Sequence, residues 1–114
     1  MLVAGRVFAA GMSLHAPELI YLEVAQVLRR YERTRELAAR RARQALADLA
    51  DLSIETYPHL PLLGRAWELR GNLTSYDSAY VALAEALDAP LLTCDARLAA
   101  GRRGARIELV GRPA

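Results

Sequence analysis

The chain has 114 residues, 54% of them hydrophobic and 25% charged, which is typical of one folded domain and excludes a disordered chain. No apolar run approaches the roughly 20 residues that a membrane-spanning helix needs, and the start lacks the basic region of a signal peptide. The single cysteine, Cys94, excludes a disulfide framework and a cysteine metal site, so we expect a cytoplasmic protein.

The charged residues are unusual in kind. All 15 basic residues are arginine, and the net charge is +2. Arginine binds phosphate groups in a bidentate manner better than lysine does. Two explanations therefore stay open, namely RNA binding and a GC-rich coding sequence.

The first half of the chain alternates between helical and extended patterns. Residues 1–11 are typical of the end of an amphipathic helix that stops at Gly11. Residues 13–16 favour a short strand, and Pro17 then begins a helix with apolar residues spaced by threes and fours. A second helix is predicted from Thr34 onward, followed by a strand over residues 52–56.

The second half continues the alternation. Pro58 and Pro61 flank a helical segment that stops at Gly71. Thr74 or Ser75 caps the next helix. A buried strand over residues 89–94, a short helix over 95–101 and a last strand over 105–110 complete the chain. Strands separated by helices predict a single α/β domain over residues 1–114, with a parallel sheet and helices on both faces.

Three acidic residues stand at positions where a ligand site is expected. Asp95 directly follows a buried strand, and Asp77 lies in the first turn of a helix. Ligands of such folds bind at the carboxyl ends of parallel strands, beside helix starts. Glu23 lies between Leu22 and Val24 on an apolar helix. Each acid also has a plain structural explanation: a helix-start acid for Asp77, a helix cap for Asp95 and a solvent-facing side chain for Glu23.

A cluster of three carboxylates would need a cation. Converging carboxylates repel one another and raise one another's pKa. Mg²⁺ or Mn²⁺ removes that cost, because these ions prefer oxygen ligands and bind through few carboxylates together with substrate phosphate. Metal-assisted hydrolysis of a phosphodiester bond is the chemistry that such a site favours.

Three motifs resemble the PIN-domain ribonucleases, specifically the VapC-type toxins of toxin–antitoxin pairs. They are P-E-L-x-x-x-E-V-A-x-V-L-R-R at residues 17–30, L-T-S-Y-D-S-A-Y-V-A-L-A-E at 73–85 and L-L-T-C-D-A-R-L at 91–98. The resemblance implies a three-layer α/β/α sandwich with a parallel sheet. It also implies a Mg²⁺- or Mn²⁺-dependent endoribonuclease that cuts RNA, forms a homodimer or higher oligomer and is neutralised by a VapB-type antitoxin.

The resemblance also assigns roles to residues. Glu23, Asp77 and Asp95 match the catalytic, metal-binding acids of the family. The hydroxyl groups of Thr93 and Ser75 match positions that can hydrogen-bond to the metal ligands.

One part of the family pattern is missing. Members begin with a central strand that ends in an aspartate, and nothing in residues 1–12 resembles it. The chain therefore looks like an N-terminally shortened member that lacks its first strand. We expect weaker metal binding and catalysis, because a ligand is absent. We also expect exposed strand edges that promote pairing with another chain.

Other interpretations concern the arginines and the activity. The arginine-rich segment from Arg29 to Arg43 could steer RNA or meet an acidic antitoxin segment, or it could be a solvated face on which Glu32 and Glu36 form ion pairs. The alternative to an active enzyme is an impaired PIN-domain remnant that only binds an antitoxin or its own kind. A phospho-acceptor receiver domain is a poor alternative, because such domains need a lysine.

Overall fold

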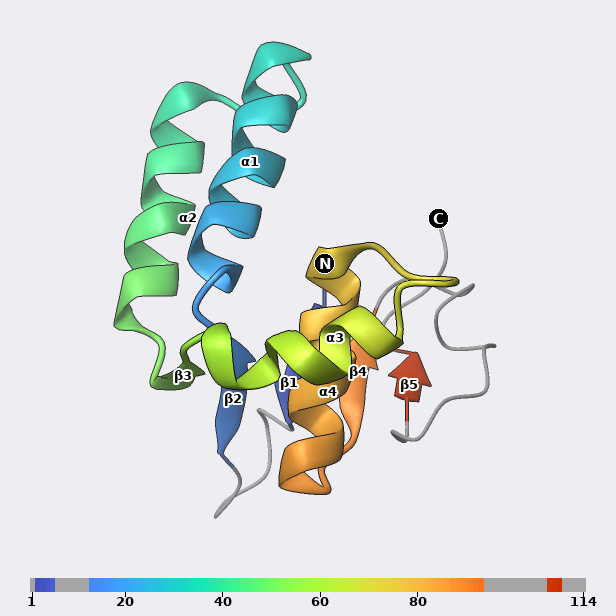
Figure 1. The fold of residues 1–114 in the computed structure, drawn as a ribbon. Coiled ribbons are helices and arrows are strands. Elements are labelled where there is room, and N and C mark those ends of the chain that lie inside the picture. Colours follow the sequence, from blue (N-terminus) through green and yellow to red (C-terminus); the bar gives the residue numbers. More distant parts are fainter. Residues whose placement is uncertain (1, 6–12, 94–106, 110–114) are drawn as a thin grey trace.

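A computed structural model describes residues 2–5, 13–93 and 107–109 (Figure 1). The described chain forms five strands, four α-helices and one turn of 3₁₀ helix. Their bounds are β1 Leu2–Gly5, β2 Leu14–Pro17, α1 Ile20–Arg33, α2 Ala39–Asp51, β3 Ile54–Tyr57, η1 Leu60–Leu62, α3 Leu63–Glu68, α4 Ser75–Leu87, β4 Leu91–Thr93 and β5 Ile107–Leu109. The predicted α/β class is confirmed. The predicted helix over residues 95–101 lies outside the described residues.

The five strands form one sheet in the order β3-β2-β1-β4-β5. Strands β2 and β3 are parallel, as are β4 and β5. Strand β1 is antiparallel to both of its neighbours, β2 and β4. It follows that β2, β3, β4 and β5 all run in the same direction, so the parallel sheet predicted from the sequence is present with β1 as its antiparallel member.

The N-terminal segment corrects two of our predictions. Residues 2–5 are a strand and not part of a helix, and this strand occupies the centre of the sheet, where we expected exposed edges. Ala4 pairs with His15 on one side and with Leu91 on the other. The physical reason is that β2 and β4 both offer unpaired backbone groups, which a short apolar segment satisfies on both of its sides.

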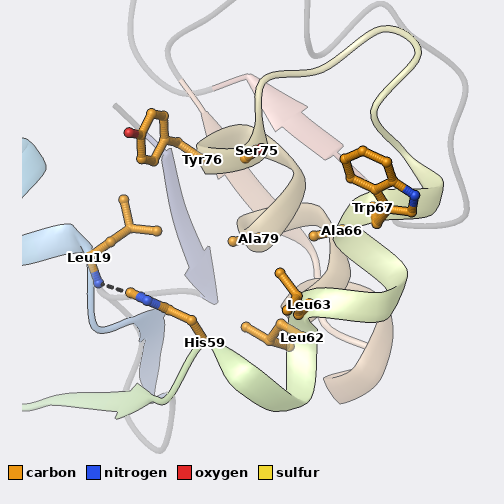
Figure 2. A pocket seen from close by; sticks show the side chains of 9 residues that line it. All are labelled: Leu19, His59, Leu62, Leu63, Ala66, Trp67, Ser75, Tyr76 and Ala79. Atoms are coloured by element: carbon orange, nitrogen blue, oxygen red, sulfur yellow. Dashed lines mark hydrogen bonds between the residues drawn. The ribbon is translucent and has the colours of Figure 1, made fainter.

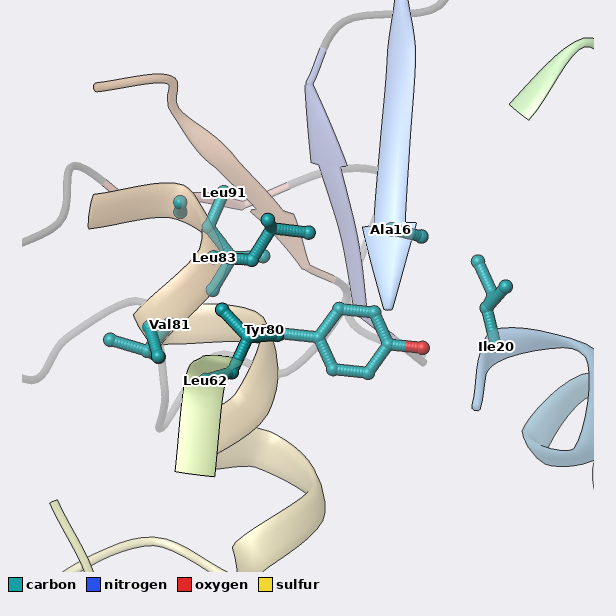
Figure 3. Packing of buried hydrophobic residues seen from close by; sticks show 9 residues of the cluster. Ala16, Ile20, Leu62, Tyr80, Val81, Leu83 and Leu91 are labelled. Carbon is teal, nitrogen blue, oxygen red and sulfur yellow. The ribbon is translucent and has the colours of Figure 1, made fainter. Parts of the chain in front are cut away.

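Helix α4 carries the core. Its residues 78–84 are all buried, and it packs against β1, β2 and β4. The buried cluster also draws in Ala16 and Leu91 from the sheet and Ile20 from the start of α1 (Figure 3). Such a continuous buried run is expected of a helix that is covered on more than one side. Helix α3 provides that second cover, since it packs on α4 (Figure 1).

An ion pair fixes α3 to α4. The Arg65 guanidinium donates to both carboxylate oxygens of Glu85, at 2.6 and 3.0 Å, and also contacts Glu68 at 3.2 Å. The fork of arginine matches a carboxylate in this two-point geometry. Helix α3 is only six residues long, so this anchor and its buried Ala66 hold it in place.

Helices α1 and α2 form a hairpin that extends away from the sheet (Figure 1). We predicted that the second helix begins near Thr34, but α2 begins at Ala39. The chain turns in between, and Arg35 has a left-handed backbone with a φ of 62°. The backbone N–H of Glu36 donates to the Tyr31 carbonyl, which closes the end of α1. Within the described residues, neither these helices nor the others are long and apolar enough to cross a membrane.

Candidate active site

Asp77 lies in the first turn of α4, as the sequence predicted. The hydroxyl oxygen of Thr74 caps this helix and accepts a hydrogen bond from the Asp77 backbone N–H at 3.1 Å. Thr74 and not Ser75 is therefore the cap. The Asp77 side chain is partly buried. A carboxylate in the first turn of a helix is stabilised by the helix dipole, by about 0.3–1 kcal/mol.

Glu23 lies in the first turn of α1, shortly after the carboxyl end of β2. Its backbone N–H donates to the Leu19 carbonyl at 3.0 Å, so its position is fixed by the start of the helix. The side chain is partly buried and turned toward α4, where its carboxylate has a hydrogen-bond partner. The solvent-facing alternative for Glu23 is therefore wrong.

The partner of Glu23 is Tyr80, a residue that the sequence analysis missed. The Tyr80 hydroxyl donates to Glu23 Oε1 at 2.6 Å, and the Tyr80 side chain has no exposed surface. Figure 3 shows its ring leaving α4 and pointing past Ala16 toward the start of α1. A buried tyrosine hydroxyl usually has a hydrogen-bond partner, so a tyrosine inside the apolar run of α4 was the available signal.

The charges of the site are coupled. Burial raises the pKa of Glu23, the hydrogen bond from Tyr80 lowers it, and the negative charge of Asp77 raises it again, so that the pKa stays above its ordinary value. Burial and the contact with Glu23 also raise the pKa of Tyr80 far above the usual range, so its hydroxyl remains a donor at any working pH. Two carboxylates from distant parts of the chain thus act on each other beside a buried phenol.

The sheet explains why these acids meet. Strands β2 and β4 run in the same direction, so their carboxyl ends lie at the same edge. Helix α4 returns to β4 through only three residues, 88–90, and its start therefore lies at that edge as well. Thr93 is the last residue of β4. Glu23, Asp77 and Thr93 thus share one edge of the sheet, as expected for a ligand site in an α/β fold.

The described residues bring together two of the three predicted acids. Asp95 lies outside the described residues, and within them no group of three potential metal ligands occurs. Strand β1 takes the central position of the sheet but its sequence, LVAG, contains no acidic residue. Glu23 and Asp77 are therefore the described candidates for holding a cation.

A small apolar pocket lies beside the first turn of α4. It has a volume of about 200 Å³ and is walled by α3, the start of α4 and the start of α1. Figure 2 shows Trp67 and Leu63 along one side and Tyr76 and Leu19 along the other. Ser75 also lines this pocket, and its support of the metal ligands stays a prediction.

The two histidines have structural partners. His59 Nε2 accepts a hydrogen bond from the Leu19 backbone N–H at 3.1 Å, which ties the loop after β3 to the start of α1 (Figure 2). His15 Nδ1 lies 2.8 Å from the Tyr57 hydroxyl and links β2 to β3.

Comparison with known proteins identifies the family. The model of the PIN domain matches residues 5–103, a range that includes Glu23, Asp77 and Asp95. The chain belongs to the PIN-domain family. The PIN match also covers β2, α1 and α4, the elements that bring Glu23 and Asp77 together.

The chain is similar to several mycobacterial PIN-domain proteins. It is 44% identical over 93 residues to VapC ribonuclease Mb0985 of Mycobacterium bovis, which covers 82% of this chain and 73% of the relative. It is 51% identical over 87 residues to ribonuclease VapC1 of Mycobacterium tuberculosis, covering 75% and 65%. It is 37% identical over 101 residues to ribonuclease VapC12 of the same species, covering 88% and 78%. The VapC-type resemblance drawn from the sequence motifs is thereby confirmed.

Proposed function

We propose that this PIN-domain chain is a metal-dependent endoribonuclease of the VapC type that hydrolyses phosphodiester bonds of RNA. The observation that carries the proposal is the pairing of Glu23 with Asp77. These acids are 54 positions apart in the sequence, and the fold places both at the edge of the sheet where an α/β protein binds ligands. Similarity to proteins named VapC ribonucleases supports RNA as the substrate.

The donor set fits Mg²⁺ or Mn²⁺. All candidate donors are carboxylate oxygens, which these hard ions prefer, and Mg²⁺ is usually held by one or two protein carboxylates together with phosphate oxygens of the substrate. Burial and the negative charge of Asp77 raise the pKa of Glu23, and a bound cation would offset both effects. Glu23, Asp77 and, by family resemblance, Asp95 would hold the ion.

A bound divalent ion would polarise the scissile phosphate and offset the charge that develops on it. The chain's own residues prepare the site for it. The N-cap of Thr74 fixes the first turn that carries Asp77, and the Tyr80 hydroxyl restricts the Glu23 carboxylate to one direction. Both acids are thus held in place before substrate binds, as a precise site requires.

The partners follow from the same similarity. We infer a VapB-type antitoxin as the regulator, RNA as the substrate and the cytoplasm as the location. A homodimer or higher oligomer stays a prediction. Exposed strand edges no longer support it, because β1 fills the centre of the described sheet. Exposed apolar side chains support it instead, since Leu63, Trp67 and Tyr76 are each more than half exposed.

The alternative is a catalytically impaired member that retains only binding. One observation favours it: the central strand β1 contributes no acid, and the described residues hold two of the acids that gather at the site. An ion held by fewer ligands is held less tightly. If the chain is an active enzyme, substitution of the acids abolishes RNA cleavage. If the chain only binds, the wild type itself cleaves no RNA.

Cleavage of a 5′-labelled RNA with Mn²⁺ would test the proposal. We expect cleavage by the wild type that depends on Mn²⁺, and a loss of at least about 100-fold in Glu23→Gln and Asp77→Asn, since each removes a charged ligand. Asp51→Asn is the matched control, because Asp51 is an exposed carboxylate at the end of α2. Mn²⁺ binding, measured by electron paramagnetic resonance, should weaken in the first two variants only. If Glu23→Gln and Asp77→Asn both cleave the RNA as fast as the wild type, the proposed site is refuted.

A further inference from the structure

The end of the α1–α2 hairpin is strongly basic. Residues 29–43, which we term the hairpin tip, contain seven arginines and two glutamates, a net charge of +5 in a chain whose total is +2. The arginines are Arg29, Arg30, Arg33, Arg35, Arg40, Arg41 and Arg43. All seven are exposed.

These arginines lack the ion pairs that a simple solvated face would form. We considered that Glu32 and Glu36 pair with arginines of the same helices, but no arginine of the hairpin tip forms an ion pair with another described residue. By contrast, Arg65 on α3 is fully engaged by Glu85 and Glu68. The tip therefore presents cations that are not neutralised by described neighbours, which favours a negatively charged partner.

Arg35 adds an observation that is independent of charge. It occupies a left-handed backbone position, with a φ of 62°, in the turn between the two helices. Glycine or asparagine adopts this conformation with less strain than arginine does. The Arg35 N–H donates to the Glu32 carbonyl and the Glu36 N–H to the Tyr31 carbonyl, which is the common Schellman ending of a helix. Glycine usually occupies the left-handed position of this motif, so arginine has no conformational advantage there.

An aromatic ring and the direction of α1 identify the partner. Tyr31 is 46% exposed within the hairpin tip, and an exposed ring among arginines is the combination that binds single-stranded nucleic acid, by stacking on bases while cations follow the phosphates. Arg30 lies seven residues after Glu23 on the same face of α1, about 10 Å further along the helix. An RNA molecule that is bound at Glu23 for cleavage would therefore reach the hairpin tip within a few nucleotides.

We propose that the hairpin tip is an RNA-binding arm that holds single-stranded RNA beside the bond to be cleaved. This inference rests on the proposed ribonuclease function and extends it to how the substrate is held. Guanidinium groups bind phosphates in a bidentate manner, and Tyr31 receives a base. An acidic protein segment could use the same arginines and could also pack on Tyr31, so its binding is measured beside that of RNA. The position of the tip along α1 from Glu23 favours RNA.

Binding of a fluorescein-labelled, single-stranded 20-nucleotide RNA, measured by anisotropy in EDTA over a range of salt, would test the arm. We expect Arg30→Gln to weaken binding by about three- to ten-fold at low salt and to reduce the slope of log K against log salt by about 0.7, the value for one phosphate contact. Tyr31→Ala should weaken binding by about five-fold or more without changing the slope. Arg65→Gln is the control, because it removes the same charge from an arginine already paired with carboxylates.

Arg35→Gly separates RNA binding from folding. It should weaken RNA binding about as much as Arg30→Gln does, while its melting temperature stays equal to or above that of the wild type, because glycine relieves the left-handed backbone. Equal RNA affinity in the wild type, Arg30→Gln and Arg35→Gly would overturn the proposal. So would weakened binding of a poly-glutamate peptide, but not of RNA, in these variants.

The failure of this inference differs from the failure of the proposed function. RNA that binds the tip without being cleaved in Mn²⁺ supports the arm and refutes the ribonuclease. RNA that is cleaved at the acids, with affinity and salt slope unchanged in the tip variants, refutes the arm and supports the ribonuclease.

Discussion

Replacing Tyr80 with phenylalanine tests the interaction that holds the site together. The substitution keeps the buried ring, so it leaves the core filled, and removes the hydroxyl that donates to Glu23 at 2.6 Å. This length is typical of an O–H donor bound to an ionised carboxylate. A hydrogen bond to a charged group contributes about 1.5–3 kcal/mol, and a neutral one about 0.5–1.5 kcal/mol.

Thermal unfolding of the metal-free protein gives the measurement. We expect Tyr80→Phe to lower the free energy of unfolding by about 2 kcal/mol at pH 8, where Glu23 is ionised, and by about 1 kcal/mol at pH 4. For a chain of this size, these losses lower the melting temperature by about 8 and 4 °C. Tyr76→Phe is the matched control, because it removes a hydroxyl from an exposed ring of the same helix and should change nothing. If Tyr80→Phe lowers the free energy of unfolding equally at both pH values, the reasoning is refuted, since the contact would then not depend on the Glu23 charge.

Three further substitutions test the surroundings of the site. Because the folded protein raises the pKa of Glu23 above its ordinary value of 4.5, the metal-free fold loses stability as the pH rises through that raised pKa. Glu23→Gln should therefore melt at a higher temperature than the wild type at pH 8 in EDTA, and the difference should disappear below pH 4.5, as calorimetry would show. Thr74→Ala removes the cap of α4 and should cost about 1 kcal/mol in urea unfolding, whereas Ser75→Ala should cost little. The buried Ser78 hydroxyl has no hydrogen-bond partner among the described residues, so Ser78→Ala should raise stability by about 1 kcal/mol; a loss in the same urea titration would reveal a partner elsewhere.

The elements with strong local signals were predicted well from the sequence. Helix α4 begins at Ser75, one residue after Thr74, which is one of the two predicted caps. Strand β4 lies within the predicted apolar segment. These signals are local, because caps and apolar periodicity act through neighbours in the sequence.

Strand β1 could not be predicted in this way. The sequence pattern of residues 1–11 favoured a helix, but the four residues LVAG pair with β2 and β4, which are 9 and 86 residues further along the chain. The turn at Arg35 was missed for a related reason, since arginine is not a residue that marks a left-handed position. In both cases tertiary contacts overrode local preference.

For Glu23 and Asp77, two of the three candidate acids, the sequence indicated the location but not the residues that support them. Asp77 was singled out by its place at a helix start, and Glu23 as an acid among apolar residues of a helix. The hydrogen bond from Tyr80 to Glu23 joins residues 57 positions apart, and tyrosine in an apolar helix reads first as core. Only the folded structure, which brings the start of α1 within reach of the Tyr80 hydroxyl, shows that this buried side chain also binds Glu23.

The central strand separates two requirements, a complete sheet and a metal site. The sheet needs backbone N–H and C=O groups between β2 and β4, and any short extended segment can provide these, even in the antiparallel direction found for β1. A metal site needs carboxylates, and LVAG has none. Glu23 and Asp77 are positioned by the starts of α1 and α4 and by the hydrogen bond from Tyr80. Different parts of the described chain therefore meet the two requirements: the backbone of β1 completes the sheet, and α1 and α4 carry the candidate acids.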